Sequence, residues 1–291
     1  MCSRLLLDAF PGSGTRRIAR RWFGLVLLAG VASLAAHPVR AEEAKLRVLI
    51  LSGANNHKWQ ETTPAIKATL EESGRFSVDV ENNVAGMKPE AFAPYAVVLS
   101  DFNLFGKDKS LQVWDAAMRK ALLDHLGQGH GLVIVHAGSS VFYDWPEFQK
   151  LACGAWQDAT SHGAIHIDRV AFTAEPSPIT AGLAPFWIRD EFWHNAGVAA
   201  GAKALATVAP PNAATPNATD PANHNNILFT TESGGARGFA IFLGHDATAM
   251  KNTAWRTLLQ RGTEWAATHK VTLPPAKDWP ASQADAERMA K

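Results

Sequence analysis

Three histidines each stand at or just beyond the end of a short apolar run of the kind that forms a β-strand. The runs and their histidines are Leu46–Ser52 with His57, Gly131–Ala137 with His136, and Gly238–Leu243 with His245. A glycine close to each histidine permits a tight turn or a close backbone approach. Ligands of open α/β sheets bind beyond the carboxyl ends of the strands. We therefore expect the three imidazoles to line one site, although structural histidines in an interaction domain are the alternative.

Carboxylates near these histidines extend the chemistry that the site could perform. Asp246 directly follows His245, where it could orient that ring or hold charge. Glu191 follows Asp190 beside aromatic residues and is a candidate acid or base, with a solvated acidic loop as the alternative. No G-x-S-x-G or G-x-C-x-G elbow follows the central strand. Cys153 lies late in an expected helix, so we expect a buried apolar residue there. The sequence thus favours acid–base chemistry over covalent catalysis.

The elements that must position these residues alternate between strands and helices. Helices are expected from Thr63-Pro64 to Gly74, over Trp114–Gly127, from Trp145-Pro146 to near Gly154, and over Trp255–Ala266. Further strands are expected at Phe76–Val80, Ala96–Asp101, Ile165–Thr173, Ala204–Val208 and Ile227–Thr231. Continuous apolar strands indicate a parallel sheet between helix layers. We therefore predict an α/β fold with a single doubly wound, mostly parallel sheet and an elaborated second half.

The charges are distributed unevenly along the chain. The whole sequence of 291 residues has a formal charge of +1, but residues 1–41 hold six arginines and one acid. An apolar run over Trp22–Ala36 follows the arginines, and Val39-Arg40-Ala41 fits a cleavage site, so residues 1–41 are expected to be a signal peptide. An uncleaved anchor is the alternative. Arg20-Arg21-Trp22-Phe23 would also suit twin-arginine export rather than the Sec route. We expect a periplasmic or secreted protein.

Removal of this segment leaves a mildly acidic protein. The remaining 250 residues carry 22 basic and 26 acidic side chains, which gives no reason to expect a nucleic-acid or membrane partner. Cys153 is then the one remaining cysteine, so no intrachain disulfide can form. The Pro-containing tail, residues 273–291, is expected to be loose.

Several motifs along the chain resemble those of the ThuA-like (trehalose utilisation) family. They are Ser52–Trp59, Val133–Ala137, Phe142–Pro146, Ser161-His162-Gly163, Pro178–Leu183, Asp190-Glu191, Leu243–Asp246 and Leu258–Ala267. The resemblance covers roughly residues 45–272. It implies a flavodoxin-like sheet similar to class I glutamine amidotransferases without their catalytic triad, and a role in carbohydrate metabolism, acting on keto-sugars or oxidised disaccharides. Phe192-Trp193-His194 departs from the tyrosine expected nearby, so sugar contacts there are not carried over.

These observations give a first account of the site. We expect a hydrolase, isomerase or lyase acting on a small carbohydrate; a non-catalytic sugar-binding module using the same crevice is the alternative. The expected catalytic residues are His57, His136, His245, Asp246 and Glu191. The expected substrate-binding residues are Asn55, Trp59, Gly138, Asp144, Trp145, His162 and Asp190. A divalent metal such as zinc could be held by His57, His162, His245 and Asp246.

Overall fold

The computed structural model describes residues 44–208 and 225–291. Residues 1–41, where the sequence predicts a signal peptide, lie outside these ranges, so that expectation stays a prediction. No helix in the described ranges is long and apolar enough to cross a membrane.

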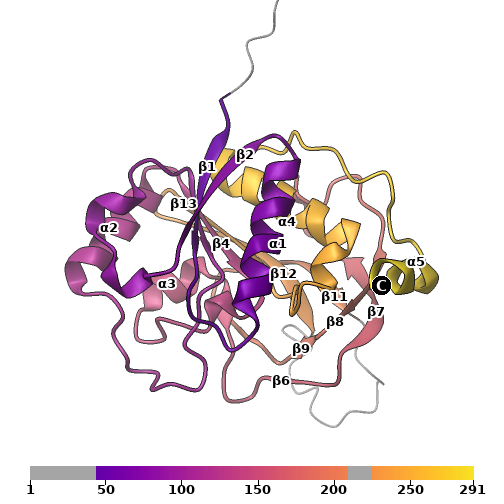
Figure 1. Cartoon of the computed structure of the whole chain (residues 1–291), viewed down its shortest axis with the longest axis horizontal. Coiled ribbons are helices and arrows are strands. Elements are labelled where there is room, and N and C mark those ends of the chain that lie inside the picture. The colour runs from indigo at the N-terminus through magenta and orange to yellow at the C-terminus, as the bar shows by residue number, and fades with distance from the viewer. Residues whose placement is uncertain (1–43, 209–224) are drawn as a thin grey trace, which may run out of the picture. The chain divides into compact units, whose positions relative to one another are not determined.

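A nine-stranded sheet organises the described chain (Figure 1). Its first five strands, in spatial order, are β2 (Phe76–Glu81), β1 (Leu46–Leu51), β3 (Val97–Ser100), β4 (Gly131–Val135) and β13 (Ala236–Ile241), all mutually parallel. The order continues with β12 (Asn226–Ser233), β11 (Lys203–Val208), β7 (His166–Phe172) and β8 (Phe186–Asp190), each antiparallel to its neighbour. The α/β class is confirmed, but the sheet is mixed rather than mostly parallel.

The antiparallel half follows from the connections between its strands. Neighbouring parallel strands need a crossover of a dozen or more residues, usually a helix. No described helix separates β7, β8, β11, β12 and β13, so these strands pair with reversed direction. The turn between β12 and β13 is Gly234-Gly235, both at positive φ (59° and 87°), as a two-residue hairpin requires.

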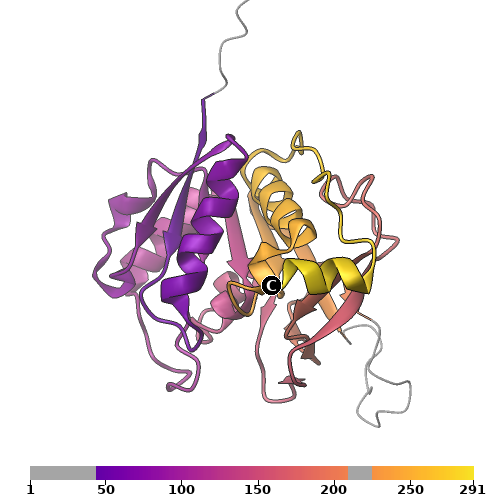
Figure 2. The same cartoon turned by 45° about the vertical axis from the view of Figure 1, so that its right-hand side comes forward.

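Helices cover both faces of the sheet (Figure 2). α1 (Trp59–Glu72) and α4 (Thr253–Thr268) pack on one face, where Ile66, Leu70 and Leu258 join the buried core. α2 (Ala116–Gly127) and α3 (Pro146–Leu151) pack on the other. The smaller elements are β5 (Gly154–Ala155) paired with β10 (Gly197–Val198), β6 (Ser161–His162) paired with β9 (Trp193–His194), and the short helices η1 (Val84–Gly86), η2 (Pro89–Phe92), η3 (His136–Ser139) and η4 (Ala249–Lys251).

Helix α1 begins one turn earlier than its sequence signals predict. The sequence predicts a helix that begins at Thr63-Pro64, but the helix begins at Trp59 and contains Pro64. Pro64 is the sixth residue of the helix and has no N–H, so the Gln60 carbonyl receives no helical hydrogen bond from this position. The Thr63 hydroxyl instead bonds Ser52 (2.7 Å) and donates to Asp101 (2.6 Å), so it fastens α1 to the sheet.

The C-terminal tail is ordered, contrary to expectation. It forms α5 (Gln283–Met289), which begins with a capping box between Ser282 and Asp285. The Trp187 amide of β8 donates to the Pro280 carbonyl (2.9 Å), and Trp279 packs on Phe186. These contacts to a strand at the edge of the sheet order a segment whose proline content alone suggests a loose chain.

Glu264 of α4 anchors the start of that tail. Its carboxylate is fully buried and accepts hydrogen bonds from the backbone amides of Thr272 (2.7 Å) and Leu273 (3.1 Å). Arg75 approaches the same carboxylate at 3.3 Å. A buried charge is tolerated only when it is paired and hydrogen-bonded in this way.

Replacing Glu264 with alanine should destabilise the fold strongly. The change removes the acceptor of two backbone amides and the carboxylate that faces Arg75, so we expect a loss of about 3–5 kcal/mol in the free energy of unfolding. Glu232→Ala, at an exposed acid that faces His269 at 3.7 Å, should cost less than about 0.5 kcal/mol. Urea unfolding followed by circular dichroism measures both, and equal losses would contradict this role for Glu264.

A histidine and carboxylate cluster at the ends of the strands

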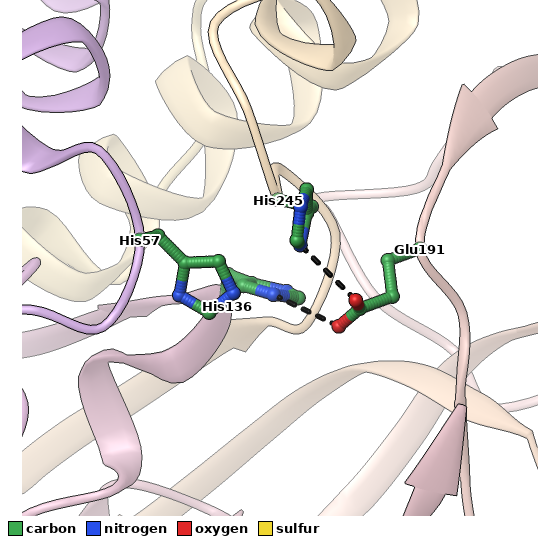
Figure 3. Close-up of side chains that lie close together, drawn as sticks. All are labelled: His57, His136, Glu191 and His245. Carbon is green, nitrogen blue, oxygen red and sulfur yellow. Dashed lines mark ion pairs between the residues drawn. The ribbon is translucent and has the colours of Figure 1, made fainter. Parts of the chain in front are cut away.

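The carboxyl ends of three parallel strands bring three histidines together (Figure 3). His57 lies in the loop after β1, His136 directly follows β4, and His245 lies in the loop after β13. The ring centroid of His57 lies 4.7 Å from that of His136 and 4.6 Å from that of His245. The ring centroids of His136 and His245 are 5.4 Å apart. The three imidazoles therefore share one site, as expected from the sequence.

Glu191 completes the cluster from the antiparallel half of the sheet, just after β8. One carboxylate oxygen lies 3.5 Å from Nε2 of His136, and the other lies 3.2 Å from Nδ1 of His245 (Figure 3). Nδ1 of His162 approaches at 3.1 Å, and the Trp193 indole donates to the carboxylate at 3.0 Å. The carboxylate is thus buried among ring nitrogens from four different segments.

Asp190 brings Glu191 within reach of the histidines. Its fully buried carboxylate accepts backbone N–H bonds from Gly244 (2.6 Å) and His245 (3.0 Å), in the loop after β13. It also accepts from the Glu191 amide (2.8 Å). All its contacts are to backbone, so Asp190 positions the site, whereas the sequence suggested that it binds substrate.

Hydrogen bonds behind the cluster fix two of the ring tautomers. Oδ1 of Asn55 faces Nδ1 of His57 (3.0 Å) and accepts from the side-chain amide of Asn103 (2.6 Å). Nδ1 of His136 faces the Phe242 carbonyl (2.9 Å). Because both partners are acceptors, both Nδ1 atoms carry the proton, which leaves Nε2 of each ring as a lone-pair donor.

His136 adopts a backbone conformation that is uncommon for its residue type. Its φ is 45°, in the left-handed region, at the point where β4 turns into η3. Such a conformation costs about 1–3 kcal/mol and persists only where the surroundings impose it. Here the Phe242 contact and the close approach of Gly138, where a Cβ would meet the Ser100 carbonyl oxygen at 2.0 Å, hold the turn in place. Gly138 therefore shapes the turn and does not reach the cavity.

The cluster has the composition of a metal site. One ligand atom from each of His57, His136, Glu191 and His245 lies within 4.8 Å of all the others. Nε2 of His136 and Nδ1 of His245 are buried and find no hydrogen-bond partner in the described chain. Burial and the neighbouring His136 and His245 lower the pKa of His57 to about 3, which keeps that ring neutral. Three imidazoles and one carboxylate are ligands that zinc favours.

This set differs from the metal ligands suggested by the sequence. His57 and His245 belong to it, but Asp246 pairs with Arg189 (3.3 Å) and caps the following turn through the Ala249 amide (2.7 Å). His162 directs Nδ1 toward its neighbour's carbonyl and Glu191, which leaves it outside the group of four. In the structure, His136 and Glu191 are the third and fourth members of the set, instead of His162 and Asp246.

Two opposing effects of the surroundings act on the pKa of Glu191. Burial by itself would raise its pKa, but His136 and His245 outweigh burial and hold the pKa of Glu191 well below its usual range. The same contact raises the pKa of His245. The carboxylate is therefore charged and draws positive charge toward the centre of the cluster.

A cavity of about 590 Å³ opens over the cluster. Its lining includes the expected residues His57, Glu191, His245, Asp246 and His162. It also includes residues that the sequence analysis missed, namely Asn56, Lys58, Glu61, Phe105, Ala137, Ser140, Trp156, Trp193, Ala247 and Thr248. In the sequence, only Phe105 offered a signal that could have pointed to the cavity, because it is an aromatic residue within a polar stretch.

The other expected substrate-binding residues lie away from the cavity. Trp59 is the first residue of α1 and Asn55 acts behind His57, so neither lines the cavity. Trp145 is buried in the core beside α3. Asp144 pairs with Arg119 at 2.7 Å. The sequence motif around Asp144 and Trp145 therefore serves packing and charge pairing.

The fold and the site define an α/β protein that presents a ligand site at the carboxyl ends of its parallel strands. A family model described as ThuA, trehalose utilisation, matches residues 47–266, and the chain belongs to this family. The resemblance found in the sequence is thereby confirmed. The comparison with curated proteins found no match.

Solved structures agree with this assignment. A ThuA-like protein from Parabacteroides merdae is 28% identical, with a TM-score of 0.69, over 82% of this chain and 96% of that one. A ThuA-like protein from Bacteroides uniformis is 16% identical, with a TM-score of 0.58, over 82% and 98%. A cytoplasmic protein from Salmonella typhimurium is 12% identical, with a TM-score of 0.52, over 75% and 97%. The last two show similarity of fold alone.

Asp101, behind the cluster, should give the fold a measurable pH dependence. Its carboxylate accepts from Thr62 (3.1 Å), Thr63 (2.6 Å) and Asn55 (3.2 Å), yet burial raises the pKa of Asp101 to about 6. Because the folded chain holds this proton more tightly than the unfolded chain, the contribution to stability is present at low pH and is lost as pH rises toward 6. The loss amounts to about 3 kcal/mol.

Asp101→Asn removes this titration. The free energy of unfolding of the variant, relative to the unmodified protein, should therefore rise by about 2.4 kcal/mol between pH 4 and pH 7, since part of the loss already occurs below pH 4. Urea unfolding at pH 4, 5, 6 and 7 measures the difference. Stability curves that run parallel across this range would show that Asp101 is not a buried acid with a raised pKa.

Proposed function

We propose that this protein is an exported enzyme that acts on a sugar or keto-glycoside, using the histidine and carboxylate cluster for acid–base chemistry with the help of a divalent cation. The observation that carries the proposal is the convergence of His57, His136, His245 and Glu191, with two buried ring nitrogens that have no hydrogen-bond partner in the described chain, beneath an open cavity. Membership of a trehalose-utilisation family supports the carbohydrate substrate. Export rests on the basic and apolar character of residues 1–41.

The donor set suits a divalent cation, with zinc as the leading candidate. His57, His136, His245 and Glu191 would hold it, with the Nδ1 protons of His57 and His136 bound by an amide oxygen and a backbone carbonyl, as in many metal sites. A bound cation would polarise a carbonyl or hydroxyl oxygen of the sugar.

His162 is the group best placed to exchange protons with solvent. Its side chain is 44% exposed, whereas that of Glu191, 3.1 Å away, is 7% exposed. An imidazole at the rim of the cavity can accept a proton from a sugar hydroxyl and pass it to water. The buried cluster then acts on the sugar itself, and His162 exchanges the proton with water.

Covalent catalysis by a thiol has no support at this site. Cys153 is fully buried, its Sγ faces the Leu151 carbonyl (3.7 Å), and it is absent from the cavity lining. Burial raises the pKa of this thiol, which opposes formation of a thiolate. The expectation of a buried, unreactive cysteine agrees with this environment.

Zinc binding tests the cation-binding part of the proposal. Protein stripped with a chelator and then incubated with zinc should retain about one zinc per chain, and Glu191→Gln and His136→Ala should each weaken binding more than tenfold, because each removes one ligand. Asp246→Asn is the control, since its carboxylate faces Arg189, and it should retain zinc. Absence of zinc from the unmodified protein, or an equal loss in Asp246→Asn, would exclude this ligand set.

Turnover of a sugar substrate tests the enzymatic part of the proposal. We expect the protein to convert singly oxidised trehalose, in which one ring carries a ketone, and Glu191→Gln and His57→Ala to lower kcat/KM by at least about 100-fold. His269→Ala, an exposed histidine outside the cavity, is the control and should retain full activity. Sugar binding without turnover would instead support the non-catalytic sugar-binding module.

A further inference from the structure

We propose that Phe105 and Trp156 form a second sugar subsite at the mouth of the cavity, which holds the uncharged second ring of a disaccharide while the first ring meets the histidine cluster. The inference rests on the proposed action on sugars and names the substrate class more narrowly: a disaccharide or a glycoside with a ring-sized second unit. Both residues line the cavity, and neither belongs to the cluster.

A continuous row of aromatic rings leads from the cluster to the surface. The ring centroids of His136 and Trp193 are 4.8 Å apart, those of Trp193 and Trp156 are 5.3 Å apart, and those of Trp156 and Phe105 are 5.6 Å apart. Exposure increases along the row, from 2% at Trp193 through the half-buried Trp156 to 42% at Phe105. Trp156 and Phe105 thus lie at the more exposed end of the row, and both line the cavity.

The exposure of Phe105 is unusual within its surroundings. Among the described residues, only three large apolar side chains are exposed, and Phe105 is the one that lines the cavity. A phenyl ring in water gains stability when an apolar surface covers it. A pyranose ring offers such a surface through the C–H groups of one face, while its hydroxyls stay in contact with polar groups or water.

Hydrogen bonds hold both aromatic residues in place before a ligand arrives. The Phe105 amide donates to Oδ1 of Asn103 (3.1 Å), and the side-chain amide of Asn103 donates to Asn55, the residue that orients His57. The Trp156 carbonyl accepts from the Tyr143 hydroxyl (3.0 Å). The loop of Phe105 is thus hydrogen-bonded to the cluster through Asn103 and Asn55. These bonds fix the distance between the two subsites and lower the entropy lost on binding.

An ion pair joins the loops that carry the two rings. Lys109 pairs with Asp158 (2.6 Å), so the chain four residues after Phe105 contacts the chain two residues after Trp156. Both side chains are exposed, and such a pair contributes little to stability. The pair marks a point where the two loops lie side by side.

The charges around the cavity favour an uncharged second ring. Lys58 is the one lysine or arginine among the described lining residues, and its ammonium lies 3.4 Å from Glu61. Asp246 is paired with Arg189. A phosphate or carboxylate on the second ring would therefore meet no unpaired cation of the kind that recognises these groups.

Two substrates that differ only in the second ring isolate the subsite. They are singly oxidised trehalose and singly oxidised methyl α-D-glucopyranoside. Phe105→Ala should raise KM for the disaccharide about fivefold with kcat unchanged, and should leave both constants for the methyl glucoside unchanged, because only the disaccharide covers the phenyl ring. Trp156→Ala should raise the disaccharide KM about tenfold, and Trp156→Phe should restore most of the loss.

Leu111→Ala is the matched control, since Leu111 is a 49% exposed apolar residue of the same loop that does not line the cavity. It should leave both substrates unaffected. Equal changes in KM for the two substrates, or no change in Phe105→Ala, would overturn the subsite. Tighter binding of a disaccharide phosphorylated on its second ring would overturn the preference for an uncharged ring.

Calorimetry with the same two compounds separates this inference from the proposed function. If neither compound is converted, the proposed enzymatic activity fails, but weaker binding of the disaccharide to Phe105→Ala, with unchanged binding of the methyl glucoside, would still support the subsite. Equal disaccharide affinity of Phe105→Ala and the unmodified protein, or no binding by either, would overturn it.

Discussion

The site depends on the buried carboxylate of Asp190. This residue ends β8, at the edge of the sheet remote from β1 and β4, and its oxygens accept the backbone amides of Gly244 and His245. A buried carboxylate is stable only when such donors satisfy it. The bonds therefore hold the loop after β13 against the end of β8. Glu191, the residue after Asp190, consequently lies 3.2 Å from Nδ1 of His245.

The cluster that results is electrostatically incomplete. Nε2 of His136 and Nδ1 of His245 face the charged carboxylate of Glu191, and neither nitrogen has a hydrogen-bond partner within the described chain. Ring nitrogens gathered around a negative charge in a buried space attract a cation or a proton. The strained backbone of His136 is consistent with a geometry kept for function rather than for stability.

The sequence allowed the parallel half of the fold and the three histidines to be predicted, because apolar runs mark buried strands and ligand residues follow their carboxyl ends. It did not show which strands pair in the antiparallel half. It also could not show that Asp190 would bind backbone while Glu191, the next residue, would face the cavity. That difference follows from alternation along the end of β8 and from its contact with a loop 54 residues later. Asp144 and Trp145 resembled ligand residues because their motif is distinctive, yet packing and an ion pair explain them.

Anomalous X-ray diffraction at the zinc edge, from crystals of the protein grown with zinc, tests the central claim most directly. Convergence of the four side chains on one cation predicts a single strong peak about 2.0–2.2 Å from ring nitrogens of His57, His136 and His245 and from an oxygen of Glu191. A crystal with no peak among these four residues, or with its peak at Asp246 or His162 instead, would contradict the proposal that the cluster is a metal centre.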